Sequence, residues 1–350
     1  MPVEEVGIDQ RQLAAEQWFH GLRRTFDLLW PGGVGNQLNQ PNPVKIAILS
    51  TGVDMSAIAY YRKKQIKDCK SFLKSTTEFE DYEGYGTYET DLILRVAPKA
   101  KVFVARICES MTLEGETENN VKKALDHTID EWKVDIIVLP YGFPTFSPII
   151  EESLLRADER RILLFAAVGN YGAMEQYLYP AMSPLAIPIH SADAYGKPSV
   201  FDPPARNVND PSFSALGEGV KAAWPPKLCK HDDRRNLRVR SGSDVATVIA
   251  AATAGLVLEF ARQPPLSNKP QVEAWLKSKK GMLRIFKLMS KPVNGMNFVV
   301  PWLLLDAAAI PPYSDDFNSA EGGFSRQSLA RWAAEFAILR EVPMDLYVAT

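Results

Sequence analysis

Four short segments of this chain are apolar at almost every position, and they constrain the fold more than any other feature. They lie at 44–49, 102–107, 134–139 and 162–168. A strand that faces solvent on one side alternates apolar and polar residues, whereas a strand covered on both faces is apolar throughout. Helical patterns at 119–132 and 149–160 separate some of these segments. Buried strands that alternate with helices predict an α/β fold, with a mainly parallel sheet and helices on both faces.

Helical patterns also flank the strand-rich middle of the chain. Near the N-terminus, apolar residues recur at spacings of three and four: Ala15, Trp18, Leu22, Phe26 and Leu29. A Pro-Gly-Gly sequence ends this helix, a Gln-Pro-Pro sequence ends the α/β part, and a closing helix is expected from about Ser325 to Arg340. We therefore predict an N-terminal helix and linker (1–43), an α/β domain (44–262) and a mainly helical extension packed on the same body (263–350).

The composition argues against several classes of partner. Lys and Arg number 40 against 42 Asp and Glu, a formal charge of −2, so the broad basic face typical of nucleic-acid binding is not expected. The three cysteines, Cys69, Cys108 and Cys229, are far apart and form no CxxC pair. This spacing does not predict a metal site. The sequence also has no HExxH or EF-hand pattern, and we expect no metal and no cofactor.

The apolar runs of the chain bear on its location. The first ten residues are acidic and lack the apolar core of a secretory signal. The longest apolar run, 245–258, is rich in Ala and Thr and falls short of the length of a membrane span. We therefore expect no membrane span and a cytoplasmic location.

Four segments carry motifs at the ends of the predicted strands and helices. They are AILSTGVD at 47–54, GYGTY at 84–88, AAVGNYG at 166–172 and SGSDVATVIAAATAGL at 241–256. In order and spacing they resemble D-[ST]-G, G-H-G-T-H, A-A-x-G-N-x-G and G-T-S-M-A-x-P of the subtilisin-like serine peptidases, especially fungal intracellular forms. The resemblance covers roughly 44–260 and implies a subtilisin-like three-layer fold, with helices on both faces of the sheet and flanking terminal helices.

The same resemblance places the family's catalytic positions on residues of other types. The position of the acid is Ser50, that of the general base is Tyr85 and that of the nucleophile is Asp244. Only Asn170, at the position of the oxyanion donor, matches the family. Acyl transfer needs a nucleophile whose proton is taken by a base of suitable pKa, usually His. Because a tyrosine has a pKa of about 10, it is a poor base at neutral pH, and we expect no peptidase activity.

The four altered or retained positions allow two interpretations. If Ser50, Tyr85, Asn170 and Asp244 still converge at the carboxyl edge of the sheet, they form a rebuilt pocket. Tyr85 and Asn170 would supply hydrogen-bond donors and Asp244 an acceptor or base, a set able to polarise a carbonyl without a covalent step. Alternatively the residues are structural, with Asp244 favoured by the start of a helix and Tyr85 filling the volume of a histidine.

Further side chains could line such a pocket. Tyr141, Phe143 and Phe146 follow the third strand, where the resemblance places the substrate-binding loop, and Met111 and Leu113 follow the second. Tyr88 stands at the second histidine of the G-H-G-T-H pattern. Together these six residues predict a groove with a mainly apolar lining and a few polar groups, which suits a small lipophilic ligand. Packing of the loops alone is the competing explanation for them.

These observations favour a subtilisin fold that no longer cleaves peptides. We expect its cleft to bind an apolar small molecule, as in a cofactor-independent cyclase or isomerase of secondary metabolism. The alternative is a non-catalytic pseudo-peptidase that holds a peptide or protein segment for binding or regulation. A closed apolar pocket would favour the small molecule, whereas an open groove with free strand edges would favour the peptide.

Overall fold

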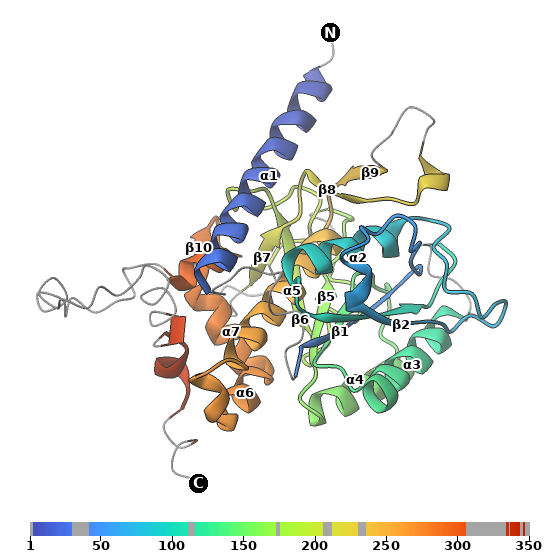
Figure 1. The fold of residues 1–350 in the computed structure, drawn as a ribbon. Helices are drawn as coiled ribbons and strands as arrows, with labels where there is room; N and C mark the ends of the chain where they lie inside the picture. The colour runs from blue at the N-terminus through green and yellow to red at the C-terminus, as the bar shows by residue number, and fades with distance from the viewer. Residues whose placement is uncertain are drawn as a thin grey trace, which may run out of the picture.

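The computed structural model describes residues 3–29, 42–110, 116–172, 176–205, 212–229, 236–305, 334–335, 337–343 and 346. A nine-stranded sheet forms its centre (Figure 1). In order across the sheet, the strands are β10 (Ser290–Val293), β11 (Met296–Val299), β7 (Phe213–Leu216), β6 (Ile187–Ala192), β5 (Leu163–Ala167), β4 (Ile136–Leu139), β1 (Lys45–Ser50), β3 (Lys101–Arg106) and β2 (Ile66–Ser71). All neighbouring pairs are parallel except β10 and β11. The predicted α/β class, with a mainly parallel sheet, is confirmed.

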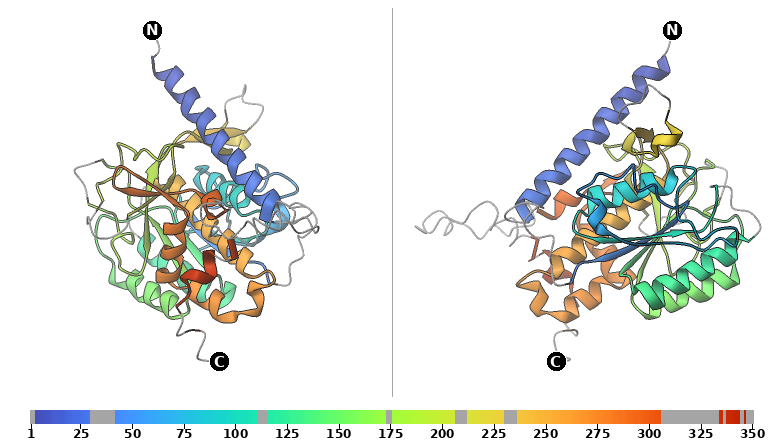
Figure 2. Two further views of the ribbon diagram at one scale, coloured as in Figure 1. Left: turned by 90° about the vertical axis from the view of Figure 1, so that its left-hand side faces the viewer. Right: turned by 45° about the vertical axis from the view of Figure 1, so that its right-hand side comes forward.

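Helices cover both faces of this sheet (Figure 2). Along β1, Ile46 and Ile48 join a core shared with α2 (Tyr85–Val96) and α5 (Ser243–Ala261). The alternate residues Ala47 and Leu49 join a second core with α3 (Thr117–His127) and α4 (Pro148–Glu159). This period of two explains why the strands are apolar throughout, since each residue faces one of two helical layers. The remaining short elements are the ribbon of β8 (Val220–Ala223) with β9 (Leu237–Arg240) and the single turns η2 (Lys63–Gln65), η3 (Thr128–Trp132), η4 (Pro226–Leu228), η5 (Leu266–Asn268) and η6 (Pro301–Leu305).

The central helix α5 is buried along its whole length. Its small residues allow close contact with the sheet, and a Cβ on Gly255 would lie 2.9 Å from Ile46 Cδ1. The helix has 19 residues, so by length and composition it could cross a membrane, contrary to the expectation from the shorter apolar run. However, every residue of the apolar window is buried inside the body, which is the environment of a core helix.

The N-terminal helix α1 (Val3–Leu29) packs one face on the body while its first turns extend beyond it (Figures 1 and 2). Trp18, Leu22 and Phe26 are buried, as the spacing predicted. Trp18 also packs against Trp302 of η6, with ring centroids 5.4 Å apart. This contact joins the N-terminal helix to η6, which follows the hairpin of β10 and β11.

The segment after residue 262 is less uniformly helical than predicted. It contains α6 (Pro270–Leu276) and α7 (Lys279–Leu288), but also the hairpin of β10 and β11, which adds two strands to the main sheet. Asn294 and Gly295 form its turn with φ of 47° and 80°. An Asn-Gly pair between short apolar segments is a strong hairpin signal, and it could have been recognised in the sequence. Most of the expected closing helix lies outside the described residues.

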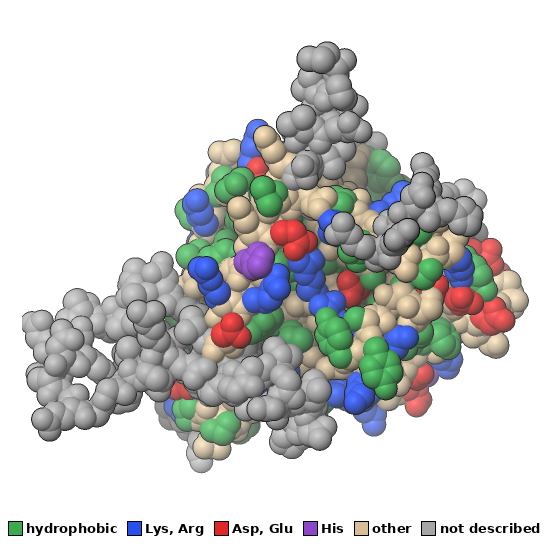
Figure 3. Space-filling view, turned by 45° about the horizontal axis from the view of Figure 1, so that its top comes forward, with side chains coloured by type: hydrophobic (Ala, Val, Ile, Leu, Met, Phe, Trp, Pro, Cys, Tyr) green, Lys and Arg blue, Asp and Glu red, His purple; other side chains and the backbone are tan. Residues whose placement is uncertain are grey.

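The face shown in Figure 3 carries side chains of both charges. Lys and Arg side chains, in blue, lie among acidic and hydrophobic ones across the described part of this face. This part of the surface therefore presents no continuous patch of a single sign.

A buried ion-pair cluster ties the helices after residue 262 to the sheet. Arg262, at the end of α5, contacts Asp135 through two nitrogens at 2.8 and 3.1 Å and Glu273 of α6 at 2.7 Å. Lys277 also contacts Asp135, at 2.8 Å. Burial alone would raise the pKa of Asp135, but the hydrogen bonds and charges of Arg262 and Lys277 outweigh it and hold this pKa below its usual range.

We predict that Asp135→Asn lowers the free energy of unfolding by about 3 kcal/mol at pH 7, because it leaves two cations together in a largely buried site. Since the folded-state pKa of Asp135 is depressed, its contribution is complete above the unfolded-state pKa of about 4 and is lost as the pH falls through the folded value. The difference in free energy of unfolding between Asp135→Asn and the wild type should therefore shrink as the pH falls below about 5. Urea unfolding as a function of pH measures it.

Asp130→Asn is the matched control, because the Asp130 carboxylate pairs with Arg156 and Arg160 on the surface. Exposed ion pairs contribute little to stability, so this variant should unfold like the wild type. An equal loss of stability in Asp130→Asn and Asp135→Asn would contradict the structural role of Asp135.

Candidate functional site

A cavity of about 230 Å³ opens where several elements meet at one edge of the sheet. It lies at the carboxyl ends of β4 and β5, beside the first turns of α2 and α5 and the end of β9. Its lining consists of Tyr85, Pro140, Tyr141, Gly142, Ala167, Gly169, Asn170, Tyr171, Leu178, Arg240, Ser243 and Asp244. The carboxyl ends of parallel strands are the usual position of binding sites in such sheets. Three of the four converging residues that the sequence predicted are therefore in this lining: Tyr85, Asn170 and Asp244.

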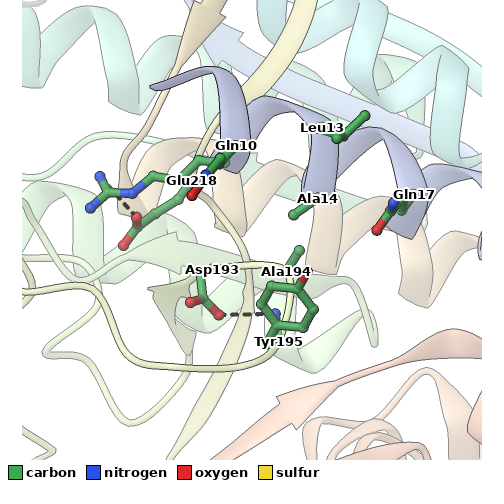
Figure 4. A pocket seen from close by; sticks show the side chains of 9 residues that line it. Gln10, Leu13, Ala14, Gln17, Asp193, Ala194, Tyr195 and Glu218 are labelled. Atoms are coloured by element: carbon green, nitrogen blue, oxygen red, sulfur yellow. Dashed lines mark hydrogen bonds and ion pairs between the residues drawn. The ribbon is translucent and has the colours of Figure 1, made fainter. Parts of the chain in front are cut away.

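A larger cavity, about 470 Å³, lies between α1 and the loop after β6 (Figure 4). Gln10, Ala14 and Gln17 of α1 lie on the side of the helix toward the loop residues Asp193 and Tyr195. It contains none of the motif residues. Arg11 and Glu218, which line it, form an ion pair with each other at 3.3 Å. We therefore assign the candidate site to the smaller cavity.

The turn after β1 and the first turn of α2 are in direct contact, which fixes one wall of the site. Thr51 Oγ1 donates to Asp81 Oδ1 at 2.9 Å and accepts from Gly86 N at 2.9 Å. Asp81 Oδ2 also accepts from the backbone and hydroxyl of Thr87, at 2.8 and 2.6 Å. A Cβ on Gly86 would lie 2.1 Å from Gly52 O, so this approach requires glycine. Gly86 thus serves the packing of these two turns.

Asp244 is held by a cation and an amide. It lies in the first turn of α5 and is 7% exposed at its side chain. Arg240 Nη2 donates to Asp244 Oδ2 at 2.8 Å, and Asn170 Nδ2 donates to Asp244 Oδ1 at 3.4 Å. Both carboxylate oxygens are therefore engaged, and the amide of Asn170 points to Asp244.

Arg240 connects Asp244 to Tyr85. Its guanidinium lies 4.1 Å from the centroid of the Tyr85 ring and 5.3 Å from that of Tyr88, in cation–π contact. Burial lowers the pKa of Arg240, but its acidic neighbours, Asp244 first among them, together act more strongly and raise this pKa above its usual value. Arg240 is thus a permanent cation at the position where the resemblance brings base and nucleophile together.

Ser243 is the hydroxyl next to Asp244, and it faces the interior. Its side chain has no exposed surface, and its Oγ accepts from Gly169 N at 3.1 Å. Ser243 N donates to Asn170 Oδ1 at 2.7 Å. These bonds join the loop after β5 to the start of α5, so Ser243 holds the frame of the cavity.

Ser50 does not join the cavity lining, in contrast to the predicted convergence of all four positions. It is fully buried at the end of β1, beside Glu89 of α2, whose pKa its hydroxyl lowers. Burial and then the charge of Asp244 act more strongly and raise the pKa of Glu89 well above its usual range. The carboxyl group nearest to Ser50 thus comes from the helix and favours its uncharged form.

Only one of the predicted aromatic lining residues reaches the cavity. Tyr141 lines it, whereas the hydroxyl of Tyr88 donates to Val220 O at 2.6 Å inside the core. Phe143 is buried in a backbone bridge with Tyr179. Phe146 is 57% exposed and packs edge-on against Tyr179. The expected apolar groove is therefore corrected to a cavity with a polar wall, because these three rings pack elsewhere.

The remaining predictions concern residues outside this cavity. Met111 and Leu113 lie outside the described residues. His127 packs on Trp132 in a helical layer, and His190 is hydrogen-bonded to Tyr177. Among the residues that the structure describes, no group of three or more His, Cys, Asp or Glu side chains is arranged to hold a metal ion.

Sequence reasoning missed Arg240 and Glu89 as site residues. Arg240 directly precedes the motif at 241–256 and follows a run of charged residues. Its spacing of four from Asp244 was an available signal, since such pairs interact when the backbone turns between them. Glu89 stands four residues after Tyr85 in a largely apolar helix, which places both residues on one face.

Comparisons with known proteins agree with this architecture. The model of the Subtilase family matches residues 42–297. The chain is 31% identical over 192 residues to the subtilisin-like protease het-Q2 of Podospora anserina, covering 52% of this chain and 50% of that protein. It is 27% identical over 219 residues to the major intracellular serine protease of Bacillus subtilis, covering 57% and 64%. Subtilisin BL of Lederbergia lenta is 25% identical over 240 residues, covering 64% and 79%. The matches thus span about half to two thirds of the first two relatives.

We predict that Arg240→Met lowers the free energy of unfolding by about 3 kcal/mol, because Asp244 then remains buried without its cation. The double variant Arg240→Met with Asp244→Leu should regain much of this loss, since no charge is left uncompensated. Urea unfolding of the wild type, both single variants and the double variant at pH 7 gives the coupling energy. A double variant as unstable as the sum of the singles would show that the two side chains act independently.

Proposed function

Because the chain belongs to the subtilase family, we propose its function from the cleft of that fold: it does not cleave peptides, and its rebuilt cleft binds a small molecule. One observation carries the proposal. An ion pair between Arg240 and Asp244, stacked on Tyr85, occupies the place where this family's motifs bring base and nucleophile together.

The chemistry of these side chains supports the loss of acyl transfer. Asp244 has no hydroxyl to acylate, and both of its oxygens accept hydrogen bonds. A tyrosine is a weak base at neutral pH, and the ring of Tyr85 lies against the guanidinium of Arg240. The neighbouring hydroxyl of Ser243 has no exposed surface and, among the residues that the structure describes, no hydrogen bond to an imidazole. Loss of a complete triad typically lowers kcat by about 10⁶-fold.

The shape and lining of the cavity support a small ligand. Its volume of about 230 Å³ is below the range of about 300–1,000 Å³ typical of drug-sized ligands, so the occupant is small. Leu178, Pro140 and Tyr141 provide apolar groups in its lining, and Arg240 and Asn170 provide polar ones. A peptide would bind along an extended groove with free strand edges, whereas a small molecule needs only a cavity of this volume.

In its stronger form, the proposal includes a reaction. Tyr85 and Arg240 are hydrogen-bond donors fixed by packing, and such groups can polarise a bound carbonyl and promote isomerisation or cyclisation without a cofactor. The cytoplasmic location and the lack of a nucleic-acid partner stay predictions from the sequence. Peptide binding by a regulatory pseudo-peptidase is the alternative that the experiments below separate from this proposal.

We predict that fluorophosphonate serine probes do not label the purified protein, because no hydroxyl in the cleft is activated by a base. The triple variant Ser50→Asp, Tyr85→His and Asp244→Ser should also remain unlabelled, since Arg240 still lies over residue 85 and Glu89 stands beside residue 50. An active subtilisin treated in parallel is the positive control. Stoichiometric labelling of Ser243 in the wild type would refute the proposal.

We predict that a small apolar metabolite found by thermal-shift screening binds in this cavity. Leu178→Trp should abolish its effect on the melting temperature, because the larger ring fills the chamber. Tyr85→Phe should weaken binding about ten-fold, or 1.4 kcal/mol, through the loss of one donor. Leu155→Trp, on the exposed surface of α4, is the matched control. The regulatory alternative would be favoured by two results together: no metabolite binds, and peptides from a library bind the wild type and Leu178→Trp equally well.

A further inference from the structure

Two adjacent tyrosines, Tyr60 and Tyr61, are among the most exposed large side chains of the described residues. Their exposed fractions are 81% and 66%. Both lie in the turns between β1 and β2, outside either strand. Single exposed apolar side chains are common, whereas two neighbouring aromatic rings in solvent point to a surface that another body covers.

The turns that carry these rings are held against the body. Arg62 N donates to Ala59 O at 2.8 Å, and Gln65 N donates to Arg62 O at 3.0 Å. The buried side chain of Gln65 donates to Pro98 O at 3.0 Å, in the segment before β3. Because the backbone is fixed in this way, the exposure of the two rings is a property of the fold.

Four lysines lie around the same turns. Two are in η2, one is in the bulge of β2 and one begins β3: Lys63, Lys64, Lys67 and Lys101. The ion pairs between described residues leave all four without a carboxylate partner. Ile66 pairs with Val102, so Lys67 and Lys101 lie beside this pair. Burial lowers the pKa of Lys101, and the charge of Lys67 lowers it further. Two ammonium groups that repel each other favour an anion.

The acidic side chains near these lysines have other partners. Asp91 accepts from Arg62 at 2.6 Å, and Asp68 accepts from Trp132 Nε1 at 2.8 Å. Glu259, whose charge acts on Lys101, is buried and accepts a hydrogen bond from the backbone at the start of β1. The turns therefore combine two exposed rings with an excess of positive charge.

Protection of the sheet edge explains only part of this arrangement. β2 is the outermost strand of the sheet, and lysines on an edge strand discourage pairing with another chain. Lys67 can serve this purpose. However, the two tyrosines and the lysines of η2 precede the strand, so edge protection does not account for them.

The chemistry of this surface favours a lipid bilayer over a nucleic acid. Tyrosine rings prefer the boundary of a membrane, where one end is apolar and the other is hydrated, and a local cluster of about four lysines attracts anionic lipids. A nucleic acid would also stack on tyrosines, but it needs a basic groove that follows its backbone. The whole chain carries 42 acidic against 40 basic side chains, which opposes long-range attraction of a nucleic acid.

We propose that Tyr60, Tyr61 and the four lysines form a docking surface for an anionic membrane, with the rings among the headgroups and the ammonium groups on the lipid anions. This surface lies at the amino end of β3, whereas the candidate site lies at the carboxyl ends of β4 and β5. The two are therefore at opposite edges of a parallel sheet, and the inference is independent of the ligand proposed for the cleft.

Sedimentation of the full chain with lipid vesicles tests the proposal. Vesicles of phosphatidylcholine that contain about 30% phosphatidylserine supply the anionic surface, and vesicles of phosphatidylcholine alone are the comparison. We expect the anionic vesicles to bind at least ten-fold more tightly. This binding should weaken at high salt, because counter-ions screen the lysines.

Lys63→Glu with Lys64→Glu tests the basic part of the surface. It reverses two charges and should lower the affinity for anionic vesicles at least ten-fold. Because neither side chain forms an ion pair with a described residue, the melting temperature should stay unchanged. Lys197→Glu with Lys291→Glu is the matched control, since it reverses two exposed charges on the loop after β6 and on β10, the edge strand opposite β2 (Figure 1). An equal loss of binding in the control would refute the docking surface.

Tyr60→Ser with Tyr61→Ser tests the aromatic part. It leaves every lysine in place and should lower the affinity for anionic vesicles about ten-fold. Replacement of both tyrosines by tryptophan should retain binding, and vesicles should shift the added tryptophan fluorescence to the blue, a change that a purely structural role would not produce. Tyr195→Ser is the matched control, because that ring is 69% exposed on the loop after β6. It should bind vesicles like the wild type.

The remaining outcomes decide against the proposal. If neither kind of vesicle binds, or both bind equally well, this surface is not a site for anionic lipids. If a single-stranded DNA oligonucleotide binds in place of vesicles, and Lys63→Glu with Lys64→Glu abolishes that binding, the partner is a nucleic acid. None of these results depends on the metabolite screen, which decides the proposed function of the cleft.

Discussion

The contact between the turn after β1 and the first turn of α2 is the constraint on which the candidate site depends. Asp81 accepts hydrogen bonds from both turns through Thr51 and Thr87. Glycine at position 86 lets the two backbones meet without a clash, and a Cβ on Gly52 would clash with Phe79 O in the segment before α2. This frame fixes the start of α2 and therefore the position of Tyr85. The side chains of the cleft can differ in chemistry because the backbone that carries them is held by other residues.

Charge balance is the second constraint. A carboxylate at the start of α5 is favoured by the free N–H groups of that helix end, yet it is nearly buried and needs a cation. Arg240 supplies this cation from the adjacent strand β9 and rests on the aromatic ring of Tyr85. A third charge in so small a space would be costly, which is consistent with the uncharged form of Glu89.

Much of the fold could be predicted from the sequence, because the relevant signals are local. The apolar segments that became β1, β3, β4 and β5 each face two helical layers, so their pattern alone predicted a covered parallel sheet. The N-terminal helix was equally clear from its periodicity. The hairpin after α7 was missed because its strands have only four residues each and lie in a segment whose helical pattern dominates. Its pairing with β7, about eighty residues earlier in the chain, leaves no local signal.

For the site, the sequence by itself determined which residue types stand at the motif positions, and it led to the prediction that they do not perform acyl transfer. Only the tertiary structure decided that Asp244 is paired with Arg240, that Glu89 stands beside Ser50, and that the rings predicted to line the cleft pack elsewhere. The reason is physical. Residue type fixes what a side chain can donate, accept or ionise, whereas burial and neighbours from distant parts of the chain fix which of these properties it retains.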